Sequence, residues 1–229
     1  MSPTLTSIEH NPEFVTKFSR HFAHELNNPI SAISSSVYLI EDFIGSAKDG
    51  VLSIEEVQPF IESIHEESDA LKSLVQEFSK FFSTNSILPS PLDLTEFLSH
   101  RVDDMKRDGL PVSMDQSNEH KTIQGDAGAL QLVLRTLVAD AVEAGATSVQ
   151  LSTNADGILI RDNRSGSTDE SFFNKWSERF TSFGARPGLG LKLPLAAKII
   201  ALHNGSLDIR GAESGGVEVR ILLPSENAA

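Results

Sequence analysis

The sequence predicts an α+β protein with an N-terminal antiparallel helical hairpin that forms a dimeric four-helix bundle, followed by a two-layer α/β sandwich. Two observations lead to this fold class. Apolar residues recur every three or four positions through two long stretches of the first third of the chain. Beyond a segment rich in proline and serine, short apolar or alternating runs, typical of strands, are mixed with shorter helical patterns.

The first stretch predicts one long helix over residues 14–44. Asn11 and Pro12 precede it, and they suit a helix cap and the first helical position. The apolar positions that define one face of this helix are Phe14, Phe18, Phe22, Leu26, Ile30, Ile33, Val37 and Ile40.

A second helix is expected after a break at residues 45–50. Ser53, Glu55 and Glu56 have the composition of a helix start. Seven-residue spacing then gives the apolar stripe of a bundle helix, with Val57, Ile64, Leu71 and Phe78. Two such helices joined by a short loop form a hairpin that leaves much of its wide stripe uncovered. We therefore expect the hairpin to dimerise.

A linker at residues 87–91, with two prolines and two serines, predicts a division into two domains, residues 1–88 and residues 89–229. The second domain is expected to contain helices over 92–108, 126–144 and 189–202. Strands are expected over 112–114, 148–151 and 157–161, with a final hairpin over 207–223. Helices combined with a largely antiparallel sheet indicate a two-layer arrangement.

Charge and composition narrow the class of partner. A formal net charge of -13 argues against broad binding to nucleic acid or to an anionic membrane, so a protein partner is expected. The chain has no cysteine, which excludes disulfides and thiolate sites. No stretch approaches the ~20 apolar residues of a membrane helix. These features predict a cytoplasmic protein without a membrane or nucleic-acid partner.

His24, Glu25 and Asn28 form the first candidate site. His24 is two residues, about 200° of helical turn, from both Phe22 and Leu26, so it points away from the apolar face. Asn28 is four residues further and shares the face of His24, while Glu25 can approach the imidazole from the side. A carboxylate that accepts the proton of one ring nitrogen makes the other nitrogen the better nucleophile, as attack on phosphorus requires.

The seven residues from His24 to Ile30, His-Glu-Leu-Asn-Asn-Pro-Ile, resemble the phosphoacceptor box of sensor histidine kinases. In that family the box lies on the first helix of a dimeric four-helix bundle. The resemblance implies that His24 is phosphorylated, that Glu25 is the acid/base and that Asn28 serves phosphatase activity. It also implies a homodimer through the hairpin and a response-regulator receiver domain as the partner.

Later fragments resemble, in order and spacing, the ATPase domain that histidine kinases share with gyrase and Hsp90-type proteins. The helix containing Asp140 stands where the family has its asparagine box, and Asp162 to Gly166 stands at its Asp-x-Gly-x-Gly box. Gly188, Leu189 and Gly190 resemble the second glycine box, whose backbone amides approach phosphates. The resemblance implies ATP and Mg²⁺ as cofactors, with Asp140 as the metal ligand. The implied nucleotide ligands are Asp140, Asp162, Gly166, Gly188, Leu189 and Gly190. The second domain is thus expected to have the histidine kinase ATPase type of sandwich.

Two of these positions depart from the family. Asp140 replaces an asparagine; its oxygen suits Mg²⁺ but adds a negative charge near the phosphates. Arg164 replaces a glycine, which puts a bulky side chain at a close turn against the nucleotide or a cation within reach of a phosphate. Only four residues separate Phe183 from Gly188, which leaves little chain for a lid.

Three hypotheses follow. The first is a two-component protein histidine kinase that autophosphorylates His24 from ATP and passes the phosphoryl group to a response-regulator aspartate. The second is an ATP-independent dimeric histidine phosphotransferase with a degenerate ATPase-like domain. The third is a non-catalytic dimeric scaffold, which would have no use for the arrangement of His24, Glu25 and Asn28.

Overall fold

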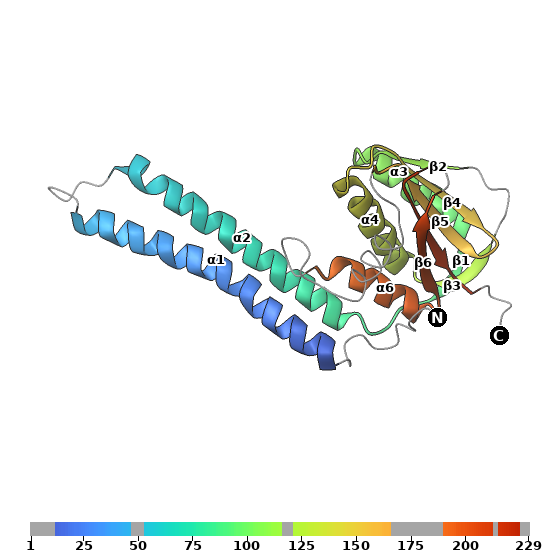
Figure 1. Ribbon diagram of the computed structural model, residues 1–229, viewed down its shortest axis with the longest axis horizontal. Coiled ribbons are helices and arrows are strands. Elements are labelled where there is room, and N and C mark those ends of the chain that lie inside the picture. Colours follow the sequence, from blue (N-terminus) through green and yellow to red (C-terminus); the bar gives the residue numbers. More distant parts are fainter. Residues whose placement is uncertain (1–11, 47–52, 116–120, 166–189, 213–214, 225–229) are drawn as a thin grey trace. The chain divides into compact units, whose positions relative to one another are not determined.

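The computed structural model describes residues 12–46, 53–115, 121–165, 190–212 and 215–224. Its elements fall into two compact units. One contains helices α1 and α2, and the other contains the strands β1 to β7 with helices α3, α4 and α6. Each unit can be followed separately in Figure 1. The predicted combination of a helical hairpin with an α+β fold is confirmed.

The first unit is a hairpin of two long helices, α1 (Pro12–Ser46) and α2 (Ile54–Ser83), that lie side by side (Figure 1). Helix α1 begins at Pro12, directly after Asn11, and α2 begins directly after Ser53, as the sequence around each start predicted. At one end of the seam the rings of Phe22 on α1 and Phe78 on α2 stack with centroids 4.8 Å apart, and Phe82, also on α2, lies tilted against Phe78 with centroids 4.7 Å apart. None of the helices in the described ranges has the length and apolar character needed to cross a membrane.

The second unit is built on a five-stranded sheet of order β2-β4-β5-β7-β6. The pair β2–β4 is parallel and the other three pairs are antiparallel. The prediction of a largely antiparallel sheet is therefore confirmed. The strands are β2 (Val112–Met114), β4 (Val149–Asn154), β5 (Gly157–Asp162), β6 (Ser206–Gly211) and β7 (Val217–Leu222).

Three helices form the second layer: α3 (Leu94–Arg107), α4 (Ala127–Glu143) and α6 (Lys192–Leu202). Asp93 caps α3 by accepting hydrogen bonds from two backbone amides, and Asp126 caps α4 by accepting one from the Ala129 amide. The core lies between the helices and the sheet. Its fully buried members include Leu98, Leu130, Leu134, Leu151, Ile158 and Ile199.

The predicted linker is wrong in part, because a strand begins inside it. Strand β1 (Ser90–Asp93) pairs antiparallel with β3 (Thr122–Gly125) in a separate two-stranded sheet. Pro91 is tolerated there because a two-stranded sheet has only edge strands. The adjoining helix starts at Leu94 rather than at residue 92, and α6 starts at Lys192 rather than at residue 189.

Candidate functional site

His24 lies on α1 with its imidazole in solvent. Its side chain is 71% exposed, whereas the neighbouring Glu25 side chain is 21% exposed. Phe22 and Leu26, two residues to either side of His24, are partly buried toward the hairpin seam. The expectation that His24 points away from the apolar face is confirmed.

Both polar neighbours of His24 approach the same ring nitrogen. The amide Nδ2 of Asn28 lies 3.4 Å from His24 Nδ1, and Glu25 Oε1 lies 3.8 Å from that atom. Within the described residues, Nε2 has no hydrogen-bond partner. The Asn28 Nδ2 group donates to Nδ1 only while that nitrogen is unprotonated. When Nδ1 carries the ring proton, the carboxylate of Glu25 faces that proton, the Asn28 amide turns its oxygen toward it, and the lone pair of Nε2 points to solvent. The arrangement therefore presents Nε2 as an accessible nucleophile.

Asp140 and Asp162 are brought together between the helical layer and the sheet. Asp140 lies on the buried stripe of α4, three residues after Leu137 and seven after Val133. Asp162 ends β5, where the alternation of a strand puts it on the same face as Ile160. Both carboxylates are almost completely buried, with 5% and 3% of their side chains exposed.

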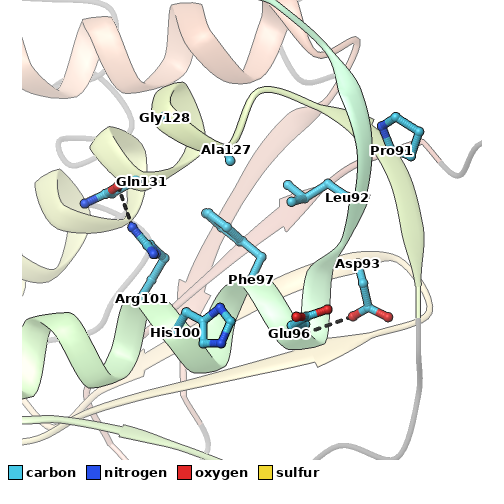
Figure 2. A pocket seen from close by; sticks show the side chains of 10 residues that line it. All are labelled: Pro91, Leu92, Asp93, Glu96, Phe97, His100, Arg101, Ala127, Gly128 and Gln131. Atoms are coloured by element: carbon cyan, nitrogen blue, oxygen red, sulfur yellow. Dashed lines mark hydrogen bonds between the residues drawn. The ribbon is translucent and has the colours of Figure 1, made fainter.

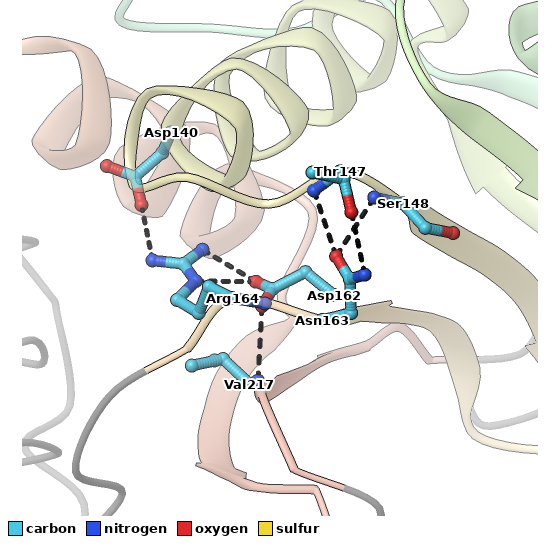
Figure 3. A network of polar contacts seen from close by, with 7 residues as sticks. All are labelled: Asp140, Thr147, Ser148, Asp162, Asn163, Arg164 and Val217. Carbon is cyan, nitrogen blue, oxygen red and sulfur yellow. Dashed lines mark hydrogen bonds and ion pairs between the residues drawn. The ribbon is translucent and has the colours of Figure 1, made fainter.

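The side chain of Arg164 fills the space between these two carboxylates (Figure 3). Its Nε and Nη2 lie 2.8 Å and 2.6 Å from Asp162 Oδ2, and its Nη1 lies 3.4 Å from Asp140 Oδ2. Its backbone N–H donates to Asp162 Oδ1 at 3.0 Å, and the Val217 N–H donates to the same oxygen at 3.2 Å. The sequence predicted the two aspartates as ligands, but not that an arginine already bridges them.

The turn that carries Arg164 is fixed on both sides. Asn163 Oδ1 accepts hydrogen bonds of 2.9 Å from the backbone amides of Thr147 and Ser148 (Figure 3). On the other side Gly216 has a φ of 87°, and a Cβ there would lie 2.0 Å from the carbonyl oxygen of Asp162. Glycine at 216 therefore permits the close approach that holds Asp162 in position.

The described residues do not fit a magnesium nucleotide in this arrangement. Both predicted ligand carboxylates, Asp140 and Asp162, already face a guanidinium. Gly190 has a φ of 66°, a left-handed conformation that favours glycine. Gly166, Gly188 and Leu189, the other predicted ligands, lie outside the described residues.

A separate hollow of about 370 Å³ lies elsewhere in the second unit, between β1, the first turns of α3 and the start of α4 (Figure 2). Arg101 in its wall donates to Gln131 at 2.8 Å, and Asp93 in its wall caps α3. None of the predicted site residues lines this hollow.

The His203 ring connects two helices, and the sequence predicted only one of its two contacts. Its Nδ1 donates to the carbonyl of Ile199 at 2.8 Å, as expected at a helix end, and its Nε2 accepts from the Asp126 N–H at 3.0 Å. The ring therefore joins the end of α6 to the cap of α4. Hydrogen bonds from the backbone N–H groups of Leu88 and Ala129 hold the pKa of Asp126 below its usual range.

Comparison with known proteins agrees with both units. The profile of the His Kinase A (phospho-acceptor) domain matches residues 14–85, and that of the histidine kinase-, DNA gyrase B-, and HSP90-like ATPase matches residues 125–227. The chain belongs to the sensor histidine kinase family. This is a family of protein histidine kinases, which are transferases, in two-component signal transduction.

Curated members of the family match most of this chain at low identity. Sensor histidine kinase YvrG of Bacillus subtilis is 23% identical over 221 residues, which cover 89% of this chain and 37% of that protein. Sensor histidine kinase ZraS of Escherichia coli O157:H7 is 24% identical over 212 residues, covering 88% of this chain and 44% of that protein. The chain thus spans less than half the length of these two relatives.

Solved histidine kinases share the fold. The structure of ThkA in complex with the response regulator TrrA matches with a TM-score of 0.62 and 20% identity, over 92% of this chain and 62% of that chain. Full-length ShkA in complex with AMPPNP matches with a TM-score of 0.59 and 20% identity, over 95% of this chain and 47% of that chain.

Proposed function

We propose that this chain transfers phosphoryl groups in two-component signalling through His24, which exchanges the group with the aspartate of a response-regulator receiver domain. The observation that carries the proposal is the geometry at His24: Nδ1 faces Glu25 and Asn28, while Nε2 is open to solvent. Membership of the histidine kinase family and the response-regulator complex of ThkA support a receiver as the partner.

Each residue of this site has a proposed part in the transfer. His24 Nε2 supplies the electron pair for the bond to phosphorus, and Glu25 accepts the proton of Nδ1 as positive charge develops on the ring. Glu25→Gln should slow transfer about 100-fold or more, the usual size of a general-base contribution. Asn28 orients a water molecule for the competing phosphatase reaction, in which water takes the phosphoryl group and inorganic phosphate is released.

We also propose that the chain acts as a homodimer through the hairpin, with residues 1–88 as the dimerisation and phosphotransfer domain and residues 89–229 as the ATPase-like domain. Exposed apolar side chains support the dimer, because they recur at multiples of seven residues along both helices. They are Ile30, Val37 and Ile44 on α1 and Ile54, Ile61 and Val75 on α2.

The dimer has a direct test in light scattering coupled to gel filtration. Val37→Glu and Ile61→Glu place charges in the apolar stripe, so each variant should elute as a monomer. Leu88→Glu is the matched control, because Leu88 is an exposed apolar residue outside the two helices. A wild-type chain that stays monomeric at high concentration would contradict the dimer.

Two donors of the phosphoryl group are candidates. The ATPase profile over residues 125–227 supports ATP, as in a histidine kinase. The contacts of Arg164 with Asp140 and Asp162 support instead a second receiver domain as the donor. Transfer through His24 is common to both candidates.

Phosphotransfer assays on the whole chain test the proposal. The chain is incubated with γ-labelled Mg-ATP, or with receiver domains from the same genome that were loaded from labelled acetyl phosphate. Acid-labile label should appear from at least one donor on the wild type and on His21→Ala, and should disappear in His24→Ala. His21 is the control because it is one turn before His24 on α1. Label that persists in His24→Ala, or no transfer from any donor, would refute the proposal and favour a scaffold.

A further inference from the structure

Arg164 is a buried arginine in a protein whose other described arginines keep more contact with solvent. Its side chain is 6% exposed, compared with 44% for Arg161, three residues earlier. A guanidinium this deep in a protein is tolerated only when its charge is matched and its donors are engaged. Asp140 and Asp162 match the charge and accept from the guanidinium, so the three side chains form one buried ionic cluster.

The acceptor capacity of Asp162 is used up within this cluster. A carboxylate offers about four lone-pair sites. Oδ1 accepts from two backbone amides, and Oδ2 accepts from Nε and Nη2 of Arg164. A purine amino group could donate to Asp162 only by displacing one of these four donors. Each displaced donor is buried and would lose its hydrogen bond without gaining one to water.

The same cluster opposes a divalent ion at Asp140. An ion bound by this carboxylate would approach its oxygens to about 2.0–2.6 Å. Nη1 of Arg164 lies 3.4 Å from Asp140 Oδ2, so the incoming ion would meet a positive charge at close range. The guanidinium thus stands where a cation would otherwise balance the two carboxylates.

From this cluster we infer that Arg164 is a built-in occupant of the nucleotide pocket, so that the chain does not bind Mg-ATP and a phosphorylated receiver aspartate is the donor to His24. This inference rests on the proposed transfer through His24. In the transfer, the bond between phosphorus and the carboxylate oxygen of the donor breaks, and its electron pair stays on that carboxylate. Nε2 of His24 supplies the pair for the new phosphorus–nitrogen bond, and the proton of Nδ1 is left to Glu25.

Titration calorimetry of the whole chain with Mg-ATP tests the inference. The variants are Arg164→Gly, which removes the occupant, and Arg164→Gly with Asp140→Asn, which also removes one of the two carboxylate charges. The double variant keeps the test decisive if the single variant does not fold. Arg161→Gln is the matched control, since it removes a half-exposed arginine three residues earlier, at the end of β5.

The wild type and Arg161→Gln should show no saturable binding. The opened variants should bind at least about 100-fold more tightly, because displacement of a guanidinium from buried carboxylates is no longer required. Wild-type binding equal to that of the double variant would overturn the inference, and so would a folded double variant that binds no nucleotide. The binding result does not depend on His24, so loss of transfer from every receiver would count against the proposed function alone.

Discussion

Replacement of Arg164 by methionine should destabilise the second unit by about 3–5 kcal/mol, the usual cost of removing one partner from a buried ion pair. Methionine has a similar length and fills the space, so the loss is mainly electrostatic. The contacts at 2.6 and 2.8 Å with Asp162 carry most of it, and the 3.4 Å contact with Asp140 carries less. Two backbone amides still donate to Asp162, which places the expected loss near the lower limit.

Urea unfolding followed by far-ultraviolet circular dichroism measures this loss as a lower midpoint with an unchanged slope. Adding Asp140→Asn to Arg164→Met should restore part of the stability, because one of the two uncompensated charges is gone. Arg161→Met is the control and should lose less than Arg164→Met, because Arg161 is half-exposed and Arg210 and Arg220 still pair with Glu218. A loss below about 1 kcal/mol for Arg164→Met would show that the cluster does not hold the pocket together.

Three further perturbations test how the second unit is built. Gly216→Ala should lower the melting temperature and weaken the hold on Asp162, since its Cβ would lie 2.0 Å from the Asp162 carbonyl oxygen; an unchanged melting curve would contradict this. His203→Ala should lower the free energy of unfolding in urea by about 1–3 kcal/mol, because the partly buried N–H of Asp126 loses its acceptor. A change within experimental error would show that this hydrogen bond does not stabilise the fold. Burial alone would raise the pKa of Glu218. Hydrogen bonds from Arg161 and Arg210 lower it by more than burial raises it, so the pKa in the folded protein lies below the usual range. The stability from Glu218 is therefore present above the ordinary carboxyl pKa and is lost as pH falls through the folded pKa. Glu218→Gln should cost about 1.5–3 kcal/mol at neutral pH and progressively less in acid; a difference that grows in acid would contradict the sign.

Much of the fold could be predicted because its signals are local. The Asp126 cap and the apolar stripe predict helix α4, and a short apolar run predicts β5. The pairing of β1 with β3 was missed because both strands are four residues long and about thirty residues apart, and Pro91 inside β1 suggested a linker. Pairing between distant short strands leaves no periodic trace in the sequence.

The two candidate sites differ in the same way. The exposure of His24 and its proximity to Asn28 follow from the geometry of one helix, and the structure agrees with both expectations. The bridge from Arg164 to Asp140 joins residues 24 apart in the chain, and it exists only after β5 packs against α4. The sequence could show that an arginine replaces a glycine, but not that this arginine turns inward.

The proposed transfer requires a phosphoryl group at Nε2 of His24, and ³¹P–¹⁵N correlation spectroscopy detects this group directly. The chain, labelled with ¹⁵N at histidine, is mixed with a phosphorylated receiver domain, and the His21→Ala and His24→Ala variants serve as references. Phosphorus should couple to Nε2 of His24 in the wild type and in His21→Ala, with no coupling in His24→Ala. Phosphorus on Nδ1, or on any other histidine, would contradict the proposed transfer.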